Sequence, residues 1–164
     1  MTKEWTVARK KSFVISALRG ARWPAKYGCV NAAYVRDGIN PKTGRKCKLH
    51  RCSKCKELFP KGKIQADHID PVVGPEGFIS WDVYIERIFC GEEGFQALCH
   101  ECHATKTLME RLKIGEKDVP KYRRLIAFKK MKATAQIKML KRFKIEPGAN
   151  GEQRVEAFKK KLKI

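Results

Sequence analysis

Four cysteines have a spacing that suits metal binding. Cys52 and Cys55 form one Cys-x-x-Cys pair, and Cys99 and Cys102 form a second pair far away in the sequence. Two residues between the members of a pair allow both sulfur atoms to point at one ion from a single turn. Four thiolates in a tetrahedral array saturate zinc and leave no open position. The sequence therefore predicts one structural zinc ion bound by these four residues.

Three more cysteines and two histidines lie outside these pairs. The chain has seven cysteines, and in a reducing compartment paired Cys-x-x-Cys steps indicate metal ligands before disulfides. Cys29, Cys47 and Cys90 are isolated, and we expect them to be ordinary core thiols. His50 and His100 adjoin the pairs and could replace a cysteine as ligands, but surface positions or phosphate contacts are the simpler expectation.

Two stretches that flank and close the loop between the cysteine pairs carry a family resemblance. The first reads Ala-Asp-His-Ile-Asp-Pro over residues 66–71, and the second reads Leu-Cys-His-Glu-Cys-His-Ala-Thr-Lys-Thr over residues 98–107. Together with the cysteine pairs they resemble the HNH endonucleases, which belong to the ββα-metal (His-Me finger) nucleases. The match is closest to small HNH proteins of tailed phages, in which a Trp-containing helix separates the halves, as Ser80-Trp81-Asp82 does here.

The resemblance covers residues 52–107, and more faintly the Trp23-Pro24 region and the C-terminal helices. It implies an α+β fold with a zinc-stapled ββα-metal core between basic helical N- and C-terminal extensions. The implied activity is hydrolysis of DNA phosphodiester bonds.

The resemblance also implies roles for individual residues. A neutral imidazole takes a proton from water near pH 7, and His68 matches the family's general base. Asp67 and His103 match the ligands of a catalytic divalent ion, and carboxylate-plus-imidazole ligation suits Mg²⁺ or Mn²⁺. Asp70 is either a partner for an imidazole or simply part of an Asp-Pro turn. Lys106 is either a phosphate contact or an ordinary lysine on a helix surface.

One position departs from the family pattern. The family has an Asn before the second strand, and here that position holds Gly94. The family's Asn organises the loop that holds the general base, so its loss puts the positioning of His68 in question. Gln96 or the Glu92-Glu93 turn are candidate substitutes.

The elements that must position these residues follow from apolar periodicity, caps and breakers. Turns or loops are expected at Asn40–Gly44, Pro71–Gly77 and Pro147–Gly151, with short strands leading from the first of these into Cys52. Further short strands are predicted over Ile64–Ile69 and Phe95–Leu98. Helices are predicted over Glu4–Arg19, Pro24–Arg36, Trp81–Phe89, Glu101–Lys113, Pro120–Arg142 and Glu152–Leu162.

Charge divides the chain into three predicted parts. The net charge of +20 favours a polyanionic partner, of which nucleic acid is the usual one. Residues 76–118 hold nine acids and five bases, whereas residues 121–164 hold fifteen bases and three acids. We therefore predict a basic helical N-terminal region (1–45), a zinc-bound HNH core (46–115) and a basic helical C-terminal arm (116–164).

The C-terminal arm is interpreted as a clamp on the DNA backbone, although a solvated helix face on a basic protein would look the same. The cations assigned to DNA contact, besides Lys106, are Lys129, Lys130, Lys138, Lys141 and Arg142. Phe143, Ile145, Val155, Phe158 and Leu162 predict that the last two helices pack as a hairpin.

The leading functional prediction is a metal-dependent DNA endonuclease that nicks or cuts DNA, most simply double-stranded DNA. The alternatives are a zinc-ribbon DNA-binding protein without activity and a basic RNA-binding protein whose cysteines bind zinc only. Neither alternative needs Asp67, His68 and His103. No apolar run is long enough to span a bilayer and the N-terminus has no signal-peptide core, so a bacterial or phage-infected cytoplasm is the expected location.

Overall fold

The computed structural model describes residues 4–164, so the first three residues of the predicted N-terminal region lie outside the described part. The chain divides into two units, one running up to Ala104 and the other covering Thr105–Ile164. The first unit combines helices and strands and the second is helical, so the predicted α+β class is confirmed. The three-part division by charge stays a prediction.

Two helices open the first unit. Helix α1 (Val7–Gly20) starts after Thr6, whose hydroxyl accepts a hydrogen bond from the backbone N–H of Arg9 (3.3 Å). Helix α2 (Pro24–Ala32) begins at a proline, which suits the first turn of a helix because its missing N–H would be unpaired there anyway.

The helix predicted to extend from Pro24 to Arg36 is wrong in its last four residues. The chain leaves the helix after Ala32 and forms strand β1 (Tyr34–Ile39). Aromatic and β-branched residues at positions 34 and 35 favour a strand, and the backbone N–H of Arg51 bonds to the carbonyl oxygen of Ala33 (2.8 Å). Pairing with a later strand, which local sequence does not reveal, therefore overrides the helical pattern.

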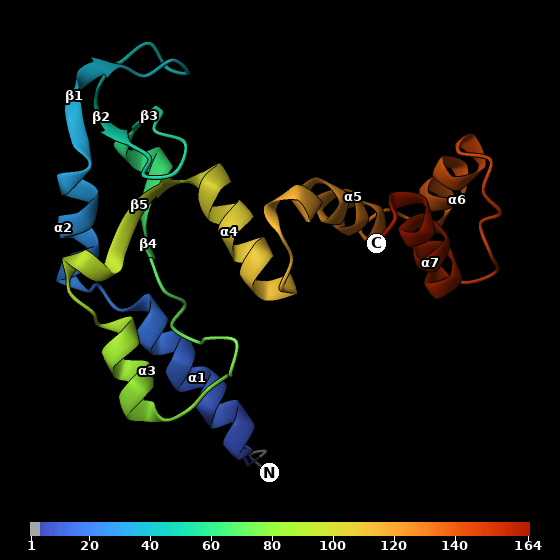
Figure 1. Cartoon of the computed structure of the whole chain (residues 1–164), viewed down its shortest axis with the longest axis horizontal. Coiled ribbons are helices and arrows are strands. Elements are labelled where there is room, and N and C mark those ends of the chain that lie inside the picture. The colour runs from blue at the N-terminus through green and yellow to red at the C-terminus, as the bar shows by residue number, and fades with distance from the viewer. Residues whose placement is uncertain (1–3) are drawn as a thin grey trace. The chain divides into compact units, whose positions relative to one another are not determined.

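A three-stranded antiparallel sheet follows, in the order β1-β2-β3. The predicted turn at Asn40–Gly44 joins β1 to β2 (Lys46–Arg51), and β3 (Leu58–Pro60) pairs with the end of β2 (Figure 1). Strand β3 was not predicted, because three residues ending in proline give no periodic signal. A short 3-10 helix η1 (Lys61–Lys63) then leads to the next strand.

The second sheet has two strands, β4 (Ile64–His68) and β5 (Phe95–Cys99), paired antiparallel. Between them lie the predicted loop, helix α3 (Trp81–Ile88) and a 3-10 helix η2 (Glu92–Gly94). Helix α4 (His100–Leu112) follows β5 without a linker, beginning in the first unit and ending in the second. The strands and helices predicted over this part of the chain are confirmed, with ends shifted by one residue.

The core of the first unit is small and contains cysteine. Its main buried cluster consists of Cys52, Ile64, Ala97, Leu98 and Cys99, and Leu49, Tyr84, Ile88 and Phe95 are buried elsewhere in the unit. Helix α2 packs on both strands of the β4–β5 sheet and contributes Cys29 and Val30 to this core. The predicted assignment of Cys29 as a core thiol agrees with this packing.

Three helices form most of the second unit: α5 (Val119–Lys129), α6 (Ala133–Arg142) and α7 (Gly151–Leu162), preceded by a 3-10 helix η3 (Glu116–Asp118). The single helix predicted over Pro120–Arg142 is therefore wrong, since Lys132 adopts an extended conformation between two helices. In one straight helix, Phe128 and Leu140 would lie about 18 Å apart along the axis. The break lets both pack in one core with Phe158.

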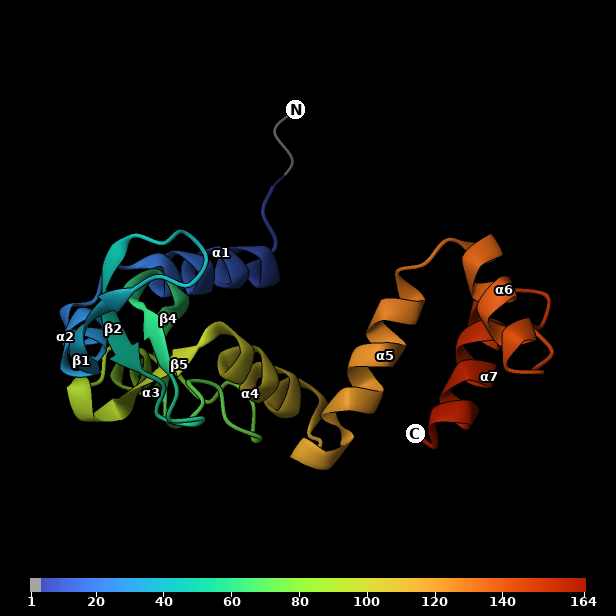
Figure 2. The same ribbon diagram turned by 90° about the horizontal axis from the view of Figure 1, so that it is seen from above.

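The predicted hairpin of the last two helices is confirmed, and α6 and α7 lie side by side in both views (Figure 1, Figure 2). At the centre of the core, Phe128 stacks on Phe158 with ring centroids 4.2 Å apart. The buried Gln136 donates from Nε2 to the carbonyl oxygen of Phe128 (3.0 Å) and accepts from Arg154 Nε (2.9 Å). This amide joins all three helices.

Among the helices described for residues 4–164, none has the length and apolar character needed to cross a membrane. The cytoplasmic location stays a prediction.

Candidate functional site

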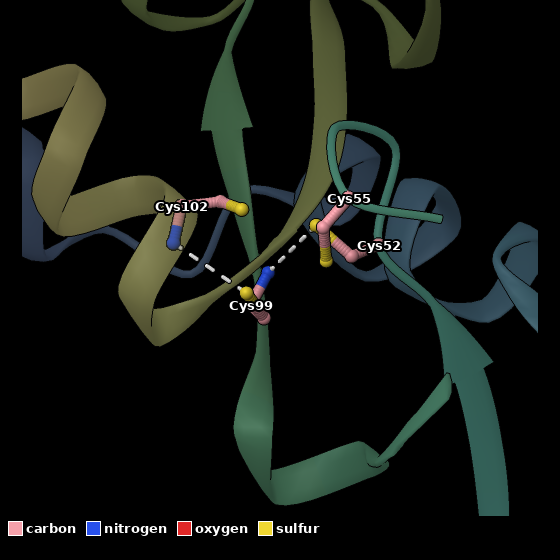
Figure 3. Close-up of side chains that lie close together, drawn as sticks. All are labelled: Cys52, Cys55, Cys99 and Cys102. Carbon is pink, nitrogen blue, oxygen red and sulfur yellow. Dashed lines mark hydrogen bonds between the residues drawn. The ribbon is translucent and has the colours of Figure 1, made fainter. Parts of the chain in front are cut away.

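The four predicted zinc ligands come together at one point of the first unit. Figure 3 shows the sulfur atoms of Cys52, Cys55, Cys99 and Cys102 turned toward one another, and all four lie within 4.8 Å of each other. Four sulfurs bound to one zinc ion at about 2.3 Å would be separated by roughly 3.8 Å. The cluster therefore has the ligand number, the ligand type and the spacing of a structural zinc site.

Local backbone geometry forms each half of the cluster. In the first half, Lys56 adopts a left-handed conformation (φ 63°) and closes a tight turn from Cys52 to Glu57. In the second half, Cys99 ends β5 and Cys102 lies in the first turn of α4. The two halves are tied together because the backbone N–H of Ser53 bonds to the carbonyl oxygen of Ala97 (2.8 Å).

Backbone N–H groups also point at the sulfur atoms. The N–H of Cys99 donates to Cys52 Sγ (3.3 Å), and the N–H of Cys102 donates to Cys99 Sγ (3.4 Å) (Figure 3). Such bonds stabilise thiolates, the form in which cysteine binds metal.

The acidities of the thiols fit a cation at the centre of the cluster. Burial opposes ionisation of Cys52, but hydrogen bonds from the backbone N–H groups of Cys99, Cys55 and Lys54 outweigh it and lower the pKa of this thiol to about 6. Burial raises the pKa of the Cys102 thiol, and its hydrogen bonds to the other three sulfurs raise it further. Ionising one sulfur thus opposes ionising its neighbour, and a bound divalent cation removes that opposition. These four residues could hold a zinc ion.

Asp67 and His103 form a second polar centre in the same unit. Asp67 lies next to the end of β4 and His103 in the first turn of α4, and Asp67 Oδ1 is 3.4 Å from His103 Nε2. The Asp67 side chain is 13% exposed and that of His103 is 35% exposed. Adjacent ligands of an octahedral Mg²⁺ ion lie about 3 Å apart, so this oxygen and this nitrogen have the separation and access that a shared ion requires.

The other oxygen of Asp67 has its own partner. Gln96 lies opposite Asp67 in the β4–β5 pairing and donates from Nε2 to Asp67 Oδ2 (3.2 Å). From the sequence alone, Gln96 is predicted only as a candidate substitute for the Asn of the HNH pattern. The signal that could have revealed its contact is strand register, since directly opposite residues share a face of the sheet.

His68 is held by different neighbours. It is the last residue of β4, its ring packs on Phe95 with centroids 4.4 Å apart, and its Nε2 donates to the carbonyl oxygen of Ile88 at the end of α3 (3.1 Å). In a neutral ring with a hydrogen on Nε2, Nδ1 carries the lone pair. The structure thus brings Asp67 and His103 into contact. It holds His68, the chain neighbour of Asp67, through Phe95 and Ile88.

Comparison of the chain with protein-family models, curated proteins and solved structures found no match. The resemblance to HNH endonucleases stays a prediction.

The surroundings of position 94 favour a glycine. Gly94 ends η2, and its carbonyl oxygen accepts from the backbone N–H of Ile69 just beyond His68 (2.9 Å). A Cβ atom at position 94 would lie 2.5 Å from Cys90 Sγ, so an Asn side chain does not fit unless Cys90 moves. The loop after His68 is therefore held by the backbone of residue 94.

His50 is not the surface residue that sequence analysis expected. Its side chain is 1% exposed, lies edge-on to Tyr34 (5.8 Å), and donates from Nδ1 to the carbonyl oxygen of Lys48 (3.3 Å). Burial lowers the pKa of His50, which favours the neutral ring. Because β2 is the middle strand, the cross-strand partners Tyr34 and Phe59 flank His50 on its two sides, a fact that the isolated pattern does not contain. His100 is exposed at the start of α4, as expected.

The remaining predicted residues have ordinary surroundings. Cys47 and Cys90, like Cys29, are half-buried. Asp70 is exposed just beyond β4, and Lys106 Nζ pairs with Glu110 Oε1 in the next turn of α4 (2.8 Å). The cations assigned to the arm are all exposed on α5, α6 and the turn between them: Lys129, Lys130, Lys138, Lys141 and Arg142.

Proposed function

We propose that this protein is a divalent-metal-dependent DNA endonuclease built on a zinc-stapled core. The observation that carries the proposal is the contact of Asp67 with His103 beside the four-cysteine cluster. Cys102 and His103 are adjacent in α4, and β4 is paired with the strand that ends in Cys99. Folding around zinc thereby fixes the distance between a carboxylate and an imidazole that belong to separate segments.

Each residue then has a chemical task. Asp67 and His103 would hold the catalytic ion, which we propose to be Mg²⁺ or Mn²⁺, because both ions prefer a carboxylate oxygen such as that of Asp67 and would keep further positions for water and phosphate oxygens. When bound, that ion neutralises charge on the phosphate and on the leaving oxygen. Gln96 keeps the Asp67 carboxylate turned toward His103 through its hydrogen bond to Oδ2.

His68 takes the proton from the attacking water. Its Nε2–H is occupied with the carbonyl oxygen of Ile88, so the proton goes to Nδ1 as the water oxygen bonds to phosphorus. The bond between phosphorus and the 3′ oxygen breaks in the same displacement. The Ile88 carbonyl also stabilises the imidazolium that results, because it accepts a hydrogen bond from the charged ring.

Charge supports DNA as the substrate. A net charge of +20 attracts polyanions, and the five exposed arm cations on α5, α6 and the intervening turn suit contact with phosphates. Such contacts carry no sequence information, so they account for affinity and orientation on the duplex.

Cleavage of supercoiled plasmid by the His68→Ala variant tests the proposal. We expect the rate with Mg²⁺ or Mn²⁺ to fall on the order of a hundredfold or more, because general-base catalysis contributes about that much. Zinc content and DNA affinity should stay as in the wild type, since proton transfer acts in the transition state. The matched control is His100→Ala, which removes an exposed histidine at the start of α4 and should cleave normally.

Asp67→Ala and His103→Ala should fail in a different way. Both residues are proposed to hold the ion, so raised Mg²⁺ or Mn²⁺ should restore part of their activity, whereas it should not rescue His68→Ala. Wild-type protein that binds DNA but is inert with every divalent ion would contradict the proposal. Cleavage that survives His68→Ala would contradict the assignment of the base.

The second candidate is a zinc-containing DNA-binding protein without nuclease activity. The observation that favours it is Gly94, because the close approach to Cys90 leaves no room for the Asn that the HNH pattern has there. The plasmid assay separates the two candidates, since the binding protein would retain zinc and DNA affinity without cleavage.

A further inference from the structure

The β1–β2 hairpin extends beyond the sheet that anchors it. Strand β3 pairs only with Leu49–Arg51 of β2, so the pairs Asp37–Lys48, Gly38–Cys47 and Ile39–Lys46 form a ribbon with two strands (Figure 1). We call residues 36–48, with the turn at their tip, the basic ribbon. A two-stranded hairpin has little stability of its own in water, so this extension adds little to the fold.

Nearly all the charged residues of the hairpin are positive. Residues 34–51 contain six cations and one acid, and the six cations are all exposed: Arg36, Lys42, Arg45, Lys46, Lys48 and Arg51. The acid, Asp37, accepts a hydrogen bond from the Tyr34 hydroxyl (3.2 Å). None of the ion pairs described for residues 4–164 includes one of these six cations. A polyanion that lies along the hairpin would therefore relieve their mutual repulsion.

The two faces of the ribbon differ. Cross-strand partners share a face, so Ile39 lies with Lys46, and Gly38 lies with Cys47. Gly38 and Cys47 are half-buried, and a Cβ atom at Gly38 would collide with the Leu49 side chain, which covers this inner face. On the outer face Ile39 is 56% exposed beside Lys46 and Lys48, and Asp37 lies opposite Lys48 on the same face. The outer face therefore presents an apolar side chain together with two lysines and one carboxylate.

Duplex DNA fits this surface in charge and in size. Paired strands lie about 4.8 Å apart. The major groove is about 12 Å wide and admits a two-stranded β-ribbon, where an apolar side chain contacts thymine methyl groups and Lys or Arg contacts guanine. The cations at the edges of such a ribbon face the phosphates on either side of the groove.

We propose that the basic ribbon inserts into the major groove of duplex DNA, with its outer face toward the base edges. This rests on the proposed function in taking DNA as the partner, but insertion does not require cleavage. The ribbon thereby supplies contacts able to distinguish base pairs, which the arm cations, as phosphate contacts, do not.

The test is a fourfold variant of the full-length, zinc-loaded protein in which Lys42, Arg45, Lys46 and Lys48 become Gln. Binding to a duplex is measured as a function of salt with no divalent ion added. The four cations would lie in or beside the groove and displace counterions from the duplex, so their loss should reduce the salt slope by up to about 3–4. Between 50 and 200 mM salt the wild type should then lose up to about a hundredfold more affinity than the variant. Retained zinc shows that the variant is folded.

The control removes the same charge elsewhere in the same unit. Arg9, Lys10, Arg19 and Arg22 are exposed in α1 or just after it, and changing these four to Gln should alter the slope far less. An equal effect of both variants would overturn the proposal, because net charge alone would then explain binding.

Two further measurements test the groove and the occupant. A major-groove dye such as methyl green should compete with the wild type, and duplex RNA should bind more weakly because its deep, narrow major groove excludes side chains. Equal binding to both duplexes, or competition only by a minor-groove ligand, would overturn insertion. A third result would also overturn insertion: the wild type self-associates, the ribbon variant does not, and both bind DNA with the same affinity. The open edge of β1 would then pair with a second copy of the chain.

Plasmid cleavage measured in parallel separates this inference from the proposed function. A wild type that binds through the ribbon without cleaving would refute the nuclease and leave the ribbon standing. A ribbon variant that binds and cleaves like the wild type would refute the ribbon and leave the nuclease standing.

Discussion

In the first unit the main buried cluster contains two members of the four-cysteine group, Cys52 and Cys99, and three other residues, whereas in the second unit it consists of Leu125, Phe128, Leu140 and Phe158. The first unit carries all the residues proposed to act in catalysis, on short strands and on the first turn of α4. The second carries exposed lysines and arginines over an ordinary apolar core. If the four cysteines bind zinc as proposed, the two units are stabilised in different ways.

The two units differ in what their cores have to hold in place. Asp67 and His103 come from segments far apart in sequence, and their 3.4 Å separation has to be kept against the flexibility of short elements. A tetrahedral metal cluster fixes such segments more tightly than a few apolar contacts can. In the described residues of the second unit no comparable cluster of metal-ligating side chains occurs, and helix packing around Phe128 is sufficient.

Removing one of the four cysteines should have the largest effect, and this effect should be confined to the first unit. Cys99→Ser should abolish zinc binding and unfold the first unit, since structural zinc contributes apparent binding free energies of roughly 10–16 kcal/mol near pH 7. Hydrogen exchange on the full chain should show lost protection in α2, β4 and β5 with protection retained in α5, α6 and α7. Cys47→Ser, a half-buried cysteine outside the cluster, is the control and should keep its zinc. A zinc-free variant with a fully protected first unit would refute the metal dependence.

The reciprocal change affects the apolar core. Phe128 is fully buried and stacked on Phe158, so Phe128→Ala should cost about 3–5 kcal/mol of unfolding free energy. Protection in α5, α6 and α7 should fall while zinc content stays at one per chain. Phe13→Ala, which removes a ring that is 61% exposed on α1, should change stability by less than about 0.5 kcal/mol. Loss of zinc from Phe128→Ala would show that the units do not fold independently.

The sequence was most informative where a pattern is local. Cys-x-x-Cys spacing identified the four clustered cysteines, and apolar alternation located β4 and β5 to within a residue. The family resemblance identified Asp67, His68 and His103 as candidate site residues. The structure places Asp67 Oδ1 3.4 Å from His103 Nε2.

Features that depend on distant partners were missed. The break at Lys132 follows from the need of Phe128 and Leu140 to reach Phe158, which lies in another helix. His50 is buried because it lies in β2, the middle strand of a sheet. Strand β2 is the middle strand only because β3 pairs with it, and β3 is too short to predict. The carbonyl of Ile88 that orients His68 has no side-chain signal at all. Each of these is set by tertiary contact, which overrides local preference.

The smallest expected effect concerns how the first unit packs around a glycine. The backbone at Gly94 lies close to the Cys90 side chain. A Cβ atom added at position 94 would lie 2.5 Å from Cys90 Sγ and 2.9 Å from Cys90 Cβ. Gly115 in the second unit has open space around the same position and an ordinary φ of −75°. Two Gly→Ala changes therefore compare the units directly.

Gly94→Ala should cost about 1–3 kcal/mol of unfolding free energy, the usual penalty for overpacking. Gly115→Ala should be neutral or stabilising by about 0.4–1 kcal/mol, because alanine restricts the unfolded chain without a clash. In a Cys90→Ala background the cost of Gly94→Ala should shrink without vanishing, since the sulfur is removed and the Cβ remains. Denaturant unfolding of the four variants measures this coupling. If Gly94→Ala lowers the unfolding free energy equally with and without the Cys90 sulfur, a clash with that sulfur is not the reason for glycine at position 94. The absence of Asn there would then need another explanation.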